Sequence, residues 1–172
     1  EPTTDIIATF NNIDIDCFGQ ITGQSIISLI GGTPSYSYDW SNGVLTPFIQ
    51  NLAAGTYTCN ITDVTGCTTV VNTTINTNSQ IVTPILVNPM SVAGANDGNI
   101  TVTPSGGVGS YAFYWVEDAT TLPVGSTPLI SSLGPGTYTC TVTDAIGCIT
   151  QVTGLIPNPS CDLLVTENIS TI

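Results

Sequence analysis

The chain has 172 residues, no Lys, Arg or His, and 12 carboxylates that give a formal net charge of −12. Because nothing in it can neutralise phosphates, binding to nucleic acid or to an anionic membrane surface by charge is excluded. The lack of histidine also excludes a histidine base, a His-ligated metal and a Ser-His-Asp arrangement.

The location of the protein is indicated by the lack of long apolar segments and by the cysteine content. No run of 18 apolar residues appears, so we expect no membrane insertion. The chain starts at Glu1 and has no signal-like apolar segment, which predicts a processed mature protein or a fragment of a longer one. Six cysteines among many turn residues favour an oxidising, extracellular or cell-surface location, the alternative being six reduced, buried thiols.

Short runs of β-branched and aromatic residues, separated by Gly, Pro and Asn, predict strands throughout and no helices. In the first half they are Ile6–Ile15, Ser25–Ile30, Tyr36–Trp40, Phe48–Leu52, Thr56–Thr62 and Thr68–Ile75. In the second half they are Ile81–Val87, Asn99–Thr103, Ser110–Val116, Leu129–Leu133, Thr137–Thr143 and Ile149–Leu155. Several short antiparallel strands in each half predict an all-β protein built of β-sandwiches.

An internal repeat divides the chain. Residues 52–67 return as residues 133–148 with ten of sixteen positions identical, at a spacing of 81. Upstream, Tyr36 and Trp40 correspond to Tyr111 and Trp115 at a spacing of 75, so six extra residues lie in the second copy. We predict two domains, residues 1–78 and 79–172, the second with a strand-like C-terminal tail.

The repeated block has the pattern of a late sandwich strand followed by a turn. Alternation places Tyr57, Cys59 and Ile61 on one face, toward the core. Tyr two residues before Cys is typical of a tyrosine corner. Asp63–Gly66 and its counterpart Asp144–Gly147 are predicted as hairpin turns.

These motifs resemble the SprB-type repeat of the long surface adhesins of gliding Bacteroidota. The residues that carry the resemblance are GGTPSYSYDWSNG with LAAGTYTCNITDVTGC, and GGVGSYAFYW with LGPGTYTCTVTDAIGC. The resemblance implies two tandem immunoglobulin-like antiparallel β-sandwiches, export and a surface role. A cysteine is common in the family near Cys17, whereas the second copy has Val92 there and carries Cys161 after its last strand.

The strand register predicts disulfides between Cys17 and Cys59 and between Cys140 and Cys161. A Cys59–Cys67 bridge is excluded, because Cys67 lies opposite about Thr62 and Cys59 is roughly 10 Å further along the hairpin. Cys67 and Cys148 would then be free or would bridge across contacts.

Four sequons make glycosylation candidates of Asn60, Asn72, Asn99 and Asn168. Such triplets also arise by chance in a chain rich in Thr and Asn, and O-linked sugar is an equal alternative.

Clustered carboxylates suggest Ca²⁺ as the one cofactor to consider, although none is required. The clusters are Asp5 with Asp14 and Asp16, Glu117 with Asp118, and Asp97 in its loop, and the alternative is that they are solvated loop charges. No two acids stand out as a catalytic pair, so we expect no enzyme. The aromatic residues share faces, which makes them core residues rather than a platform for sugar stacking.

The strand-like ends suggest assembly. Each end either completes its own domain or adds a strand to a neighbouring subunit, which gives head-to-tail filaments when the rotation does not close. The candidate side chains are Ile6, Ile7, Phe10, Leu164, Val165 and Ile169. We therefore expect a secreted structural protein that self-associates into a homopolymer, as a subunit of an extracellular filament or surface adhesin. The alternative is a module that binds glycans or a host surface through loops such as Gly31–Ser35 or Glu117–Gly125.

Overall fold

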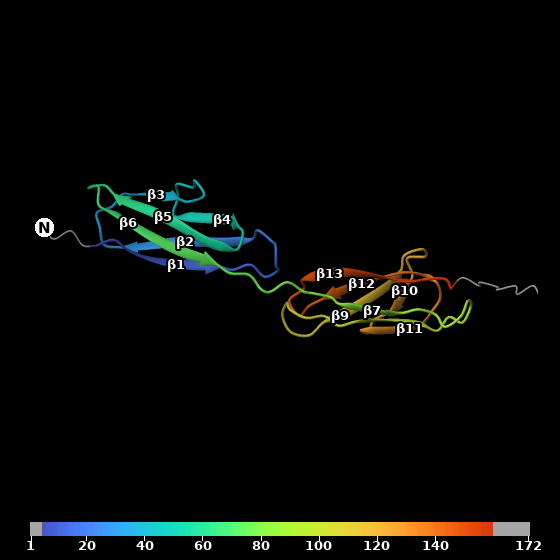
Figure 1. Cartoon of the computed structure of the whole chain (residues 1–172). Helices are drawn as coiled ribbons and strands as arrows, with labels where there is room; N and C mark the ends of the chain where they lie inside the picture. Colours follow the sequence, from blue (N-terminus) through green and yellow to red (C-terminus); the bar gives the residue numbers. More distant parts are fainter. Residues whose placement is uncertain (1–4, 160–172) are drawn as a thin grey trace, which may run out of the picture. The chain divides into compact units, whose positions relative to one another are not determined.

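The computed structural model describes residues 5–159, and these residues form only strands, turns and loops (Figure 1). The strands of the first half are β1 (Ile7–Ile13), β2 (Gly23–Ile30), β3 (Tyr36–Trp40), β4 (Phe48–Leu52), β5 (Gly55–Asp63) and β6 (Thr68–Ile75). Those of the second half are β7 (Ile85–Asn88), β8 (Gly98–Val102), β9 (Ala112–Glu117), β10 (Pro123–Gly125), β11 (Leu129–Leu133), β12 (Gly136–Thr143) and β13 (Ile149–Ile156). Within the described part of the chain, no helix is long and apolar enough to span a membrane.

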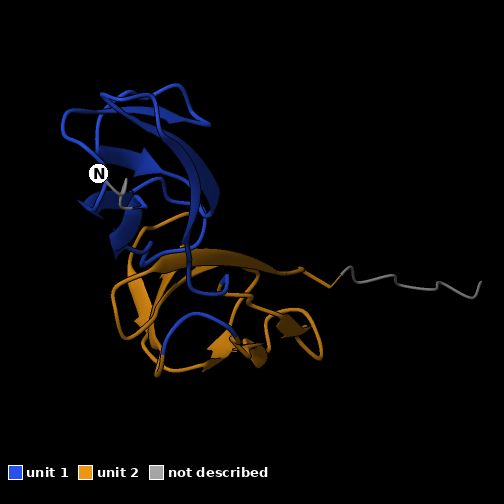
Figure 2. Ribbon diagram, turned by 90° about the vertical axis from the view of Figure 1, so that its left-hand side faces the viewer, with its two compact units in different colours: residues 1–80, 106–108 blue, residues 81–105, 109–172 orange. Residues whose placement is uncertain are grey.

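The chain divides into two compact units (Figure 2). The first contains residues 1–80 and 106–108, and the second contains residues 81–105 and 109–172. Each unit holds one copy of the repeat, and the division after Gln80 lies two residues beyond the boundary expected from the sequence.

In the first unit, two antiparallel three-stranded sheets face each other. One has the order β1-β2-β4 and the other the order β3-β5-β6. Counted along the chain, strands one, two and four share a sheet, and strands three, five and six share the other. This is the arrangement of the A, B and E strands and of the C, F and G strands of an immunoglobulin sandwich, so the expected fold class is confirmed.

The second unit repeats this topology with one addition. Its sheets have the orders β7-β8-β11 and β10-β9-β12-β13. The extra strand, β10, comes from the segment that carries the six additional residues, and it pairs with the edge of β9. The sequence analysis did not predict it, because a strand of three residues with Pro at its start gives no alternation to detect.

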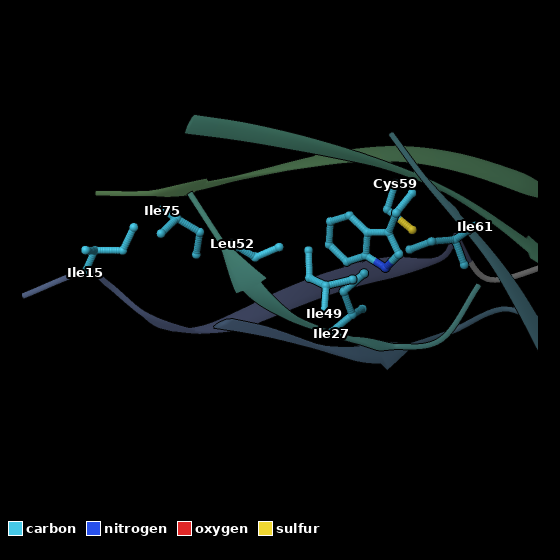
Figure 3. Close-up of a cluster of buried hydrophobic side chains, with 8 residues drawn as sticks. Ile15, Ile27, Ile49, Leu52, Cys59, Ile61 and Ile75 are labelled. Atoms are coloured by element: carbon cyan, nitrogen blue, oxygen red, sulfur yellow. The ribbon is translucent and has the colours of Figure 1, made fainter. Parts of the chain in front are cut away.

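The core of the first unit is built from the inward residues of both sheets. Figure 3 shows buried side chains on one side from β2 and β4 and on the other from β5 and β6, including Ile27, Ile49, Cys59 and Ile75. The largest buried side chain of the cluster is Trp40, which is 2% exposed, and Trp115 takes the same place in the second unit at 0%. The tryptophans thus belong to the core, as predicted, and Tyr36 and Tyr38 pack against it half-buried, whereas Phe18 and Tyr114 are exposed.

The repeated aromatic residues are fixed by the same hydrogen bonds in both copies. The indole Nε1 of Trp40 donates to the carbonyl of Thr46 at 3.0 Å, and that of Trp115 donates to the carbonyl of Thr127 at 3.0 Å. The hydroxyl of Tyr57 donates to the carbonyl of Ala53 at 2.9 Å. The Tyr138 hydroxyl donates to Gly134 at 3.1 Å. Both tyrosines therefore form the predicted tyrosine corner.

A β-bulge explains a pair of glycines that the repeat preserves. Asn51 is the extra residue between two partners on β2, and its φ of 55° is left-handed. Opposite the bulge, a Cβ on Gly23 would lie 2.5 Å from Ile75 Cγ2 and 3.0 Å from the Leu52 carbonyl oxygen. The second unit repeats the bulge at Ser132, with Gly98 opposite. Glycine is thus required here by close packing.

Candidate functional site

The first candidate site is the N-terminal strand. β1 pairs with β2 along its whole length, from Ile7 with Ile30 to Ile13 with Gln24. Phe10 packs on Trp40 with 6.4 Å between ring centroids, and Ile6 also contacts the core cluster, whereas Ile7 is 58% exposed. Of the two alternatives for this segment, the structure has the one in which it completes its own unit, so Ile6 and Phe10 are not available as assembly residues in this state. Leu164, Val165 and Ile169 lie outside the described residues.

The cysteines form a second candidate site, and here the predicted pairings are wrong. Cys17 and Cys148 are each disulfide-bonded. Cys59, Cys67 and Cys140 are free thiols. Neither the Cys17–Cys59 nor the Cys140–Cys161 bridge can therefore exist in this structure, and Cys161 itself lies outside the described residues.

The physical reason is the length of the sandwich. Cys59 stands beside Val71 on β6, whereas Ile15, just before Cys17, stands beside Thr77. Six residues of strand separate Val71 from Thr77, which is about 20 Å. The segment that carries Cys17 thus lies at the end of the unit where β5 starts, as expected, but Cys59 is too far along β5 from that end for a disulfide to form.

Cys59 and Cys140 instead act as core side chains. Both are 0% exposed, and each pairs across the sheet with a buried tryptophan, Trp40 or Trp115. Burial raises the pKa of the Cys59 thiol and raises that of Cys140 to about 11. A thiol in that state is a poor nucleophile, so neither cysteine has the environment of a reactive site. Cys67, by contrast, is exposed.

The carboxylates are engaged by their own loops. In the first hairpin turn, Asp63 accepts hydrogen bonds from the backbone N–H groups of Thr33, Thr65 and Cys67 at 2.9, 2.9 and 3.0 Å. These hydrogen bonds lower the pKa of Asp63, with the largest effect from the Thr33 N–H, the next from the Thr65 side chain, and smaller ones from the N–H groups of Cys67 and Thr65. The pKa of Asp97 is lowered by Ser91, whose hydroxyl and N–H both donate to it. In the second unit, Asp144 accepts from the N–H of Cys148 at 2.9 Å, which repeats the turn.

These hydrogen bonds do not decide whether the carboxylates bind a metal ion. Among residues 5–159, no three His, Cys, Asp or Glu residues converge as a metal site would require. Asp14 is bonded to Asn76, and Asp5, Asp16, Glu117 and Asp118 are exposed or half-buried at separate places on loops and strand ends. Calcium binding by these acids stays a prediction.

The glycosylation candidates differ in accessibility. Asn60 and Asn72 are exposed on the outward face of β5 and β6, and the side-chain oxygen of Asn72 accepts from the Thr58 hydroxyl at 2.8 Å. Asn99 is half-buried, and its oxygen accepts from the Asn88 amide at 2.7 Å. Asn168 lies outside the described residues. The first two are therefore the sites that an enzyme could reach in the folded unit.

One polar cluster has no counterpart in the sequence analysis. Asn12, Ser25 and Thr73 meet between the two sheets of the first unit, although they are far apart in the chain. The only sequence signal was a Ser at a position where the alternation of β2 points inward, and Ser25 is 0% exposed.

Comparison with solved structures gives multi-domain immunoglobulin proteins. Three titin domains, I67–I69, are similar at 12% identity and a TM-score of 0.45, covering 90% of this chain and 65% of that one. DIP-gamma IG1+IG2 is similar at 12% identity and a TM-score of 0.41, covering 91% of this chain and 97% of that one. The N-terminal four Ig domains of Dscam1 are similar at 14% identity and a TM-score of 0.39. The match covers 84% of this chain and only 42% of the Dscam1 chain. Likenesses this weak carry no argument, and the fold assignment rests on the strand order.

Sequence comparison gives the more specific result. None of the curated proteins compared with the chain matches it. The family model of the SprB repeat matches residues 9–45 and residues 93–120. The first match runs from β1 through β3 and the second from the loop before β8 through β9, so each unit has one. The resemblance seen in the sequence motifs is thus confirmed, and each unit contains a segment that matches the SprB repeat.

Proposed function

We propose that this chain is a non-catalytic structural segment of an extracellular surface adhesin or filament. The observation that carries the proposal is that the repeated side chains serve the fold in both copies. The tryptophans fill the cores, the tyrosines form the corners, and the turn aspartates bond to their own backbone. SprB-repeat sequence in both units and the presence of disulfide-bonded cysteines support an extracellular location.

In this proposal the chain acts as a spacer and a link. Two sandwiches in tandem supply length, and neighbouring subunits join head-to-tail into a homopolymer. Since β1 is paired along its whole length and contributes Phe10 to the core, donating it to a neighbour would first require removing it from its own sheet. Joining is therefore assigned to contacts at the ends of the units or to residues 160–172.

The experiment is negative-stain electron microscopy of the full chain beside a chain that ends at Pro159. The proposal expects filaments or end-to-end oligomers from the full chain, and their loss or shortening on truncation if residues 160–172 form the link. Particles of single-chain size at every concentration, in both proteins, would exclude self-assembly. The remaining role would then be that of a segment within a longer adhesin.

A second candidate is glycan binding by the inserted hairpin loop. Thr121, a β-branched residue, has a left-handed φ of 57°, and the neighbouring Leu122 is 62% exposed. β-Branched residues rarely adopt this conformation, and backbone strain of this kind clusters at functional sites. A glycan array tests this function, with the full chain beside a variant in which Glu117–Gly125 is replaced by the shorter loop of the first copy. Saturable binding that the replacement abolishes would support the proposal. Binding that survives the replacement would show that this loop does not recognise the sugar.

A further inference from the structure

The first unit is closed by a seam between the segment that follows its start and the segment that leads to its end. We define the terminal seam as residues 12–16 and residues 73–78. Ile15 and Thr77 form a parallel bridge, and the N–H of Ile15 donates to the carbonyl of Asn76 at 2.9 Å. β1 and β6 belong to different sheets, so the seam joins the two layers of the sandwich.

At one end of the seam, the Asn12 side chain makes four hydrogen bonds. Its amide nitrogen donates to the Thr73 hydroxyl at 2.8 Å and to the Thr74 carbonyl at 3.1 Å. Its amide oxygen accepts from the hydroxyls of Ser25 at 2.7 Å and Thr73 at 3.1 Å. Asn12 is exposed, as is its bond to the Thr74 carbonyl, but Ser25 is 0% and Thr73 5% exposed, so the bonds to these two hydroxyls are partly sheltered from competing water.

At the other end, the Asp14 carboxylate accepts from both the backbone N–H and the side-chain amide of Asn76, at 2.8 and 3.1 Å. These two bonds lower the pKa of Asp14. Two residues further along each segment, the Asn78 amide donates to the carbonyl of Asp16 at 2.8 Å. The seam is thus a ladder of side-chain and backbone bonds along two parallel segments.

The second unit has the same strands without the ladder. By the repeat spacings of 75 and 81, Asn12, Ser25 and Thr73 correspond to Val87, Ile100 and Gly154. A Cβ on Gly154 would lie 2.9 Å from Ile100 Cδ1 and 3.3 Å from Val87 Cγ2, so these positions form a close apolar contact. Asp14 and Asn76 correspond to Pro89 and Pro157, which have no N–H to donate. Among the described residues of this unit, no isolated bridge corresponds to the one between Ile15 and Thr77.

We propose that the terminal seam resists tension along the chain and makes the first unit mechanically stronger than the second. Tension on the chain pulls the two parallel segments in opposite directions along their length. The bonds between them are then loaded together, in shear, rather than opened one after another. At this place the described residues of the second unit have apolar contacts instead, which slide more easily because they have no preferred direction. The inference stands whether or not the chain forms filaments.

The test is single-molecule force spectroscopy on the full chain with its disulfides reduced, so that the load passes through both units. Two classes of unfolding event are expected, the weaker first. Because the second copy has six extra residues, its event should release about 2 nm more chain. The proposal expects this longer event to be the weaker one.

Variants then assign the strength to the seam. Asn12→Ala and Asp14→Ala should each lower the force of the shorter, stronger event and leave the longer event unchanged. Asn11→Ala, on the outward side of the same strand, is the matched control and should change neither. Ile61→Val, which trims the core of β5, should lower the denaturant midpoint of the first unit while its unfolding force stays near that of the wild type.

Two results would overturn the proposal. One is a single force for both units or a weaker first unit. The other is an unfolding force that follows the denaturant midpoint across all four variants, because the seam would then contribute only ordinary stability.

Discussion

At the residue scale, the cysteines separate what a sequence pattern can determine from what it cannot. Alternation along β5 and β12 put Cys59 and Cys140 on the inward faces, and both are fully buried. Their partners were predicted wrongly, because a disulfide depends on which loops meet in space and not on strand register. In immunoglobulin domains the late-strand cysteine bonds to one on the second strand. Here the inward residues of β2 are Ser25 and Ile27, so the thiol packs against tryptophan instead.

The first prediction concerns thiol reactivity. In the native, non-reduced protein, a maleimide should label Cys67, which is exposed, and should leave Cys59 and Cys140 unlabelled until the protein is unfolded. The buried thiols are protected both by packing and by their raised pKa values. Peptide mapping by mass spectrometry reads the sites, and rapid native labelling of Cys59 or Cys140 would contradict the structure.

A second prediction concerns the tyrosine corners. Tyr57→Phe removes the hydroxyl that bonds to Ala53 and keeps the ring, so the first unit should lose about 1 kcal/mol of unfolding free energy. Tyr138→Phe should do the same to the second unit, because its hydroxyl bonds to Gly134. Denaturant titration measures both, and Tyr114→Phe, on an exposed ring, is the control. No change in either corner variant would mean that these bonds add nothing over water.

At the scale of strands and turns, the sequence analysis was most accurate where strands alternate clearly. β3, β4, β6 and β11 have the predicted bounds, and most others differ by one or two residues at an end. It was least accurate where the chain bends. β7 begins at Ile85, not Ile81, because the run contains Pro84 and Val82 forms an isolated bridge with Ser105. The terminal seam was missed for a related reason: Asn12, Ser25 and Thr73 meet only once both sheets are folded.

The hairpin turns allow a third prediction, on pH. Hydrogen bonds hold the pKa of Asp63 below its ordinary value, so the stabilisation that they give is present above the ordinary aspartate range near pH 4. It is lost as the pH falls through the lowered pKa and the carboxylate is protonated. Asp63→Asn should therefore be less stable than the wild type at pH 7, and the gap should narrow on acidification below pH 4.

The wild type must be compared with Asp63→Asn at each pH, because acid also relieves repulsion among the 12 carboxylates and so stabilises both proteins. Asp5→Asn, which removes one exposed charge from the same unit, controls for that effect. Thermal denaturation between pH 2 and 7, a range from about two units below the ordinary aspartate pKa to about three units above it, gives the curves. A gap between wild type and Asp63→Asn that stays constant over this range would show that the ionised carboxylate is not what holds the turn.

At the scale of the whole molecule, the two units are variations on one design. They share the strand order, the buried tryptophan, the tyrosine corner, the bulge and the aspartate turn. They differ in the extra hairpin strand β10, in the terminal seam and in the cysteines outside the core. Since the shared residues are used for folding, the differences are where function specific to this chain should be sought.

The central claim is that this chain is a structural segment that associates with copies of itself. Size-exclusion chromatography with light scattering, on the non-reduced full chain over a series of concentrations, tests it most directly. The account predicts a mass that rises with concentration in steps of one 17.8 kDa chain, as head-to-tail addition requires. A constant mass of one chain across the series, or a closed dimer that grows no further, would contradict it.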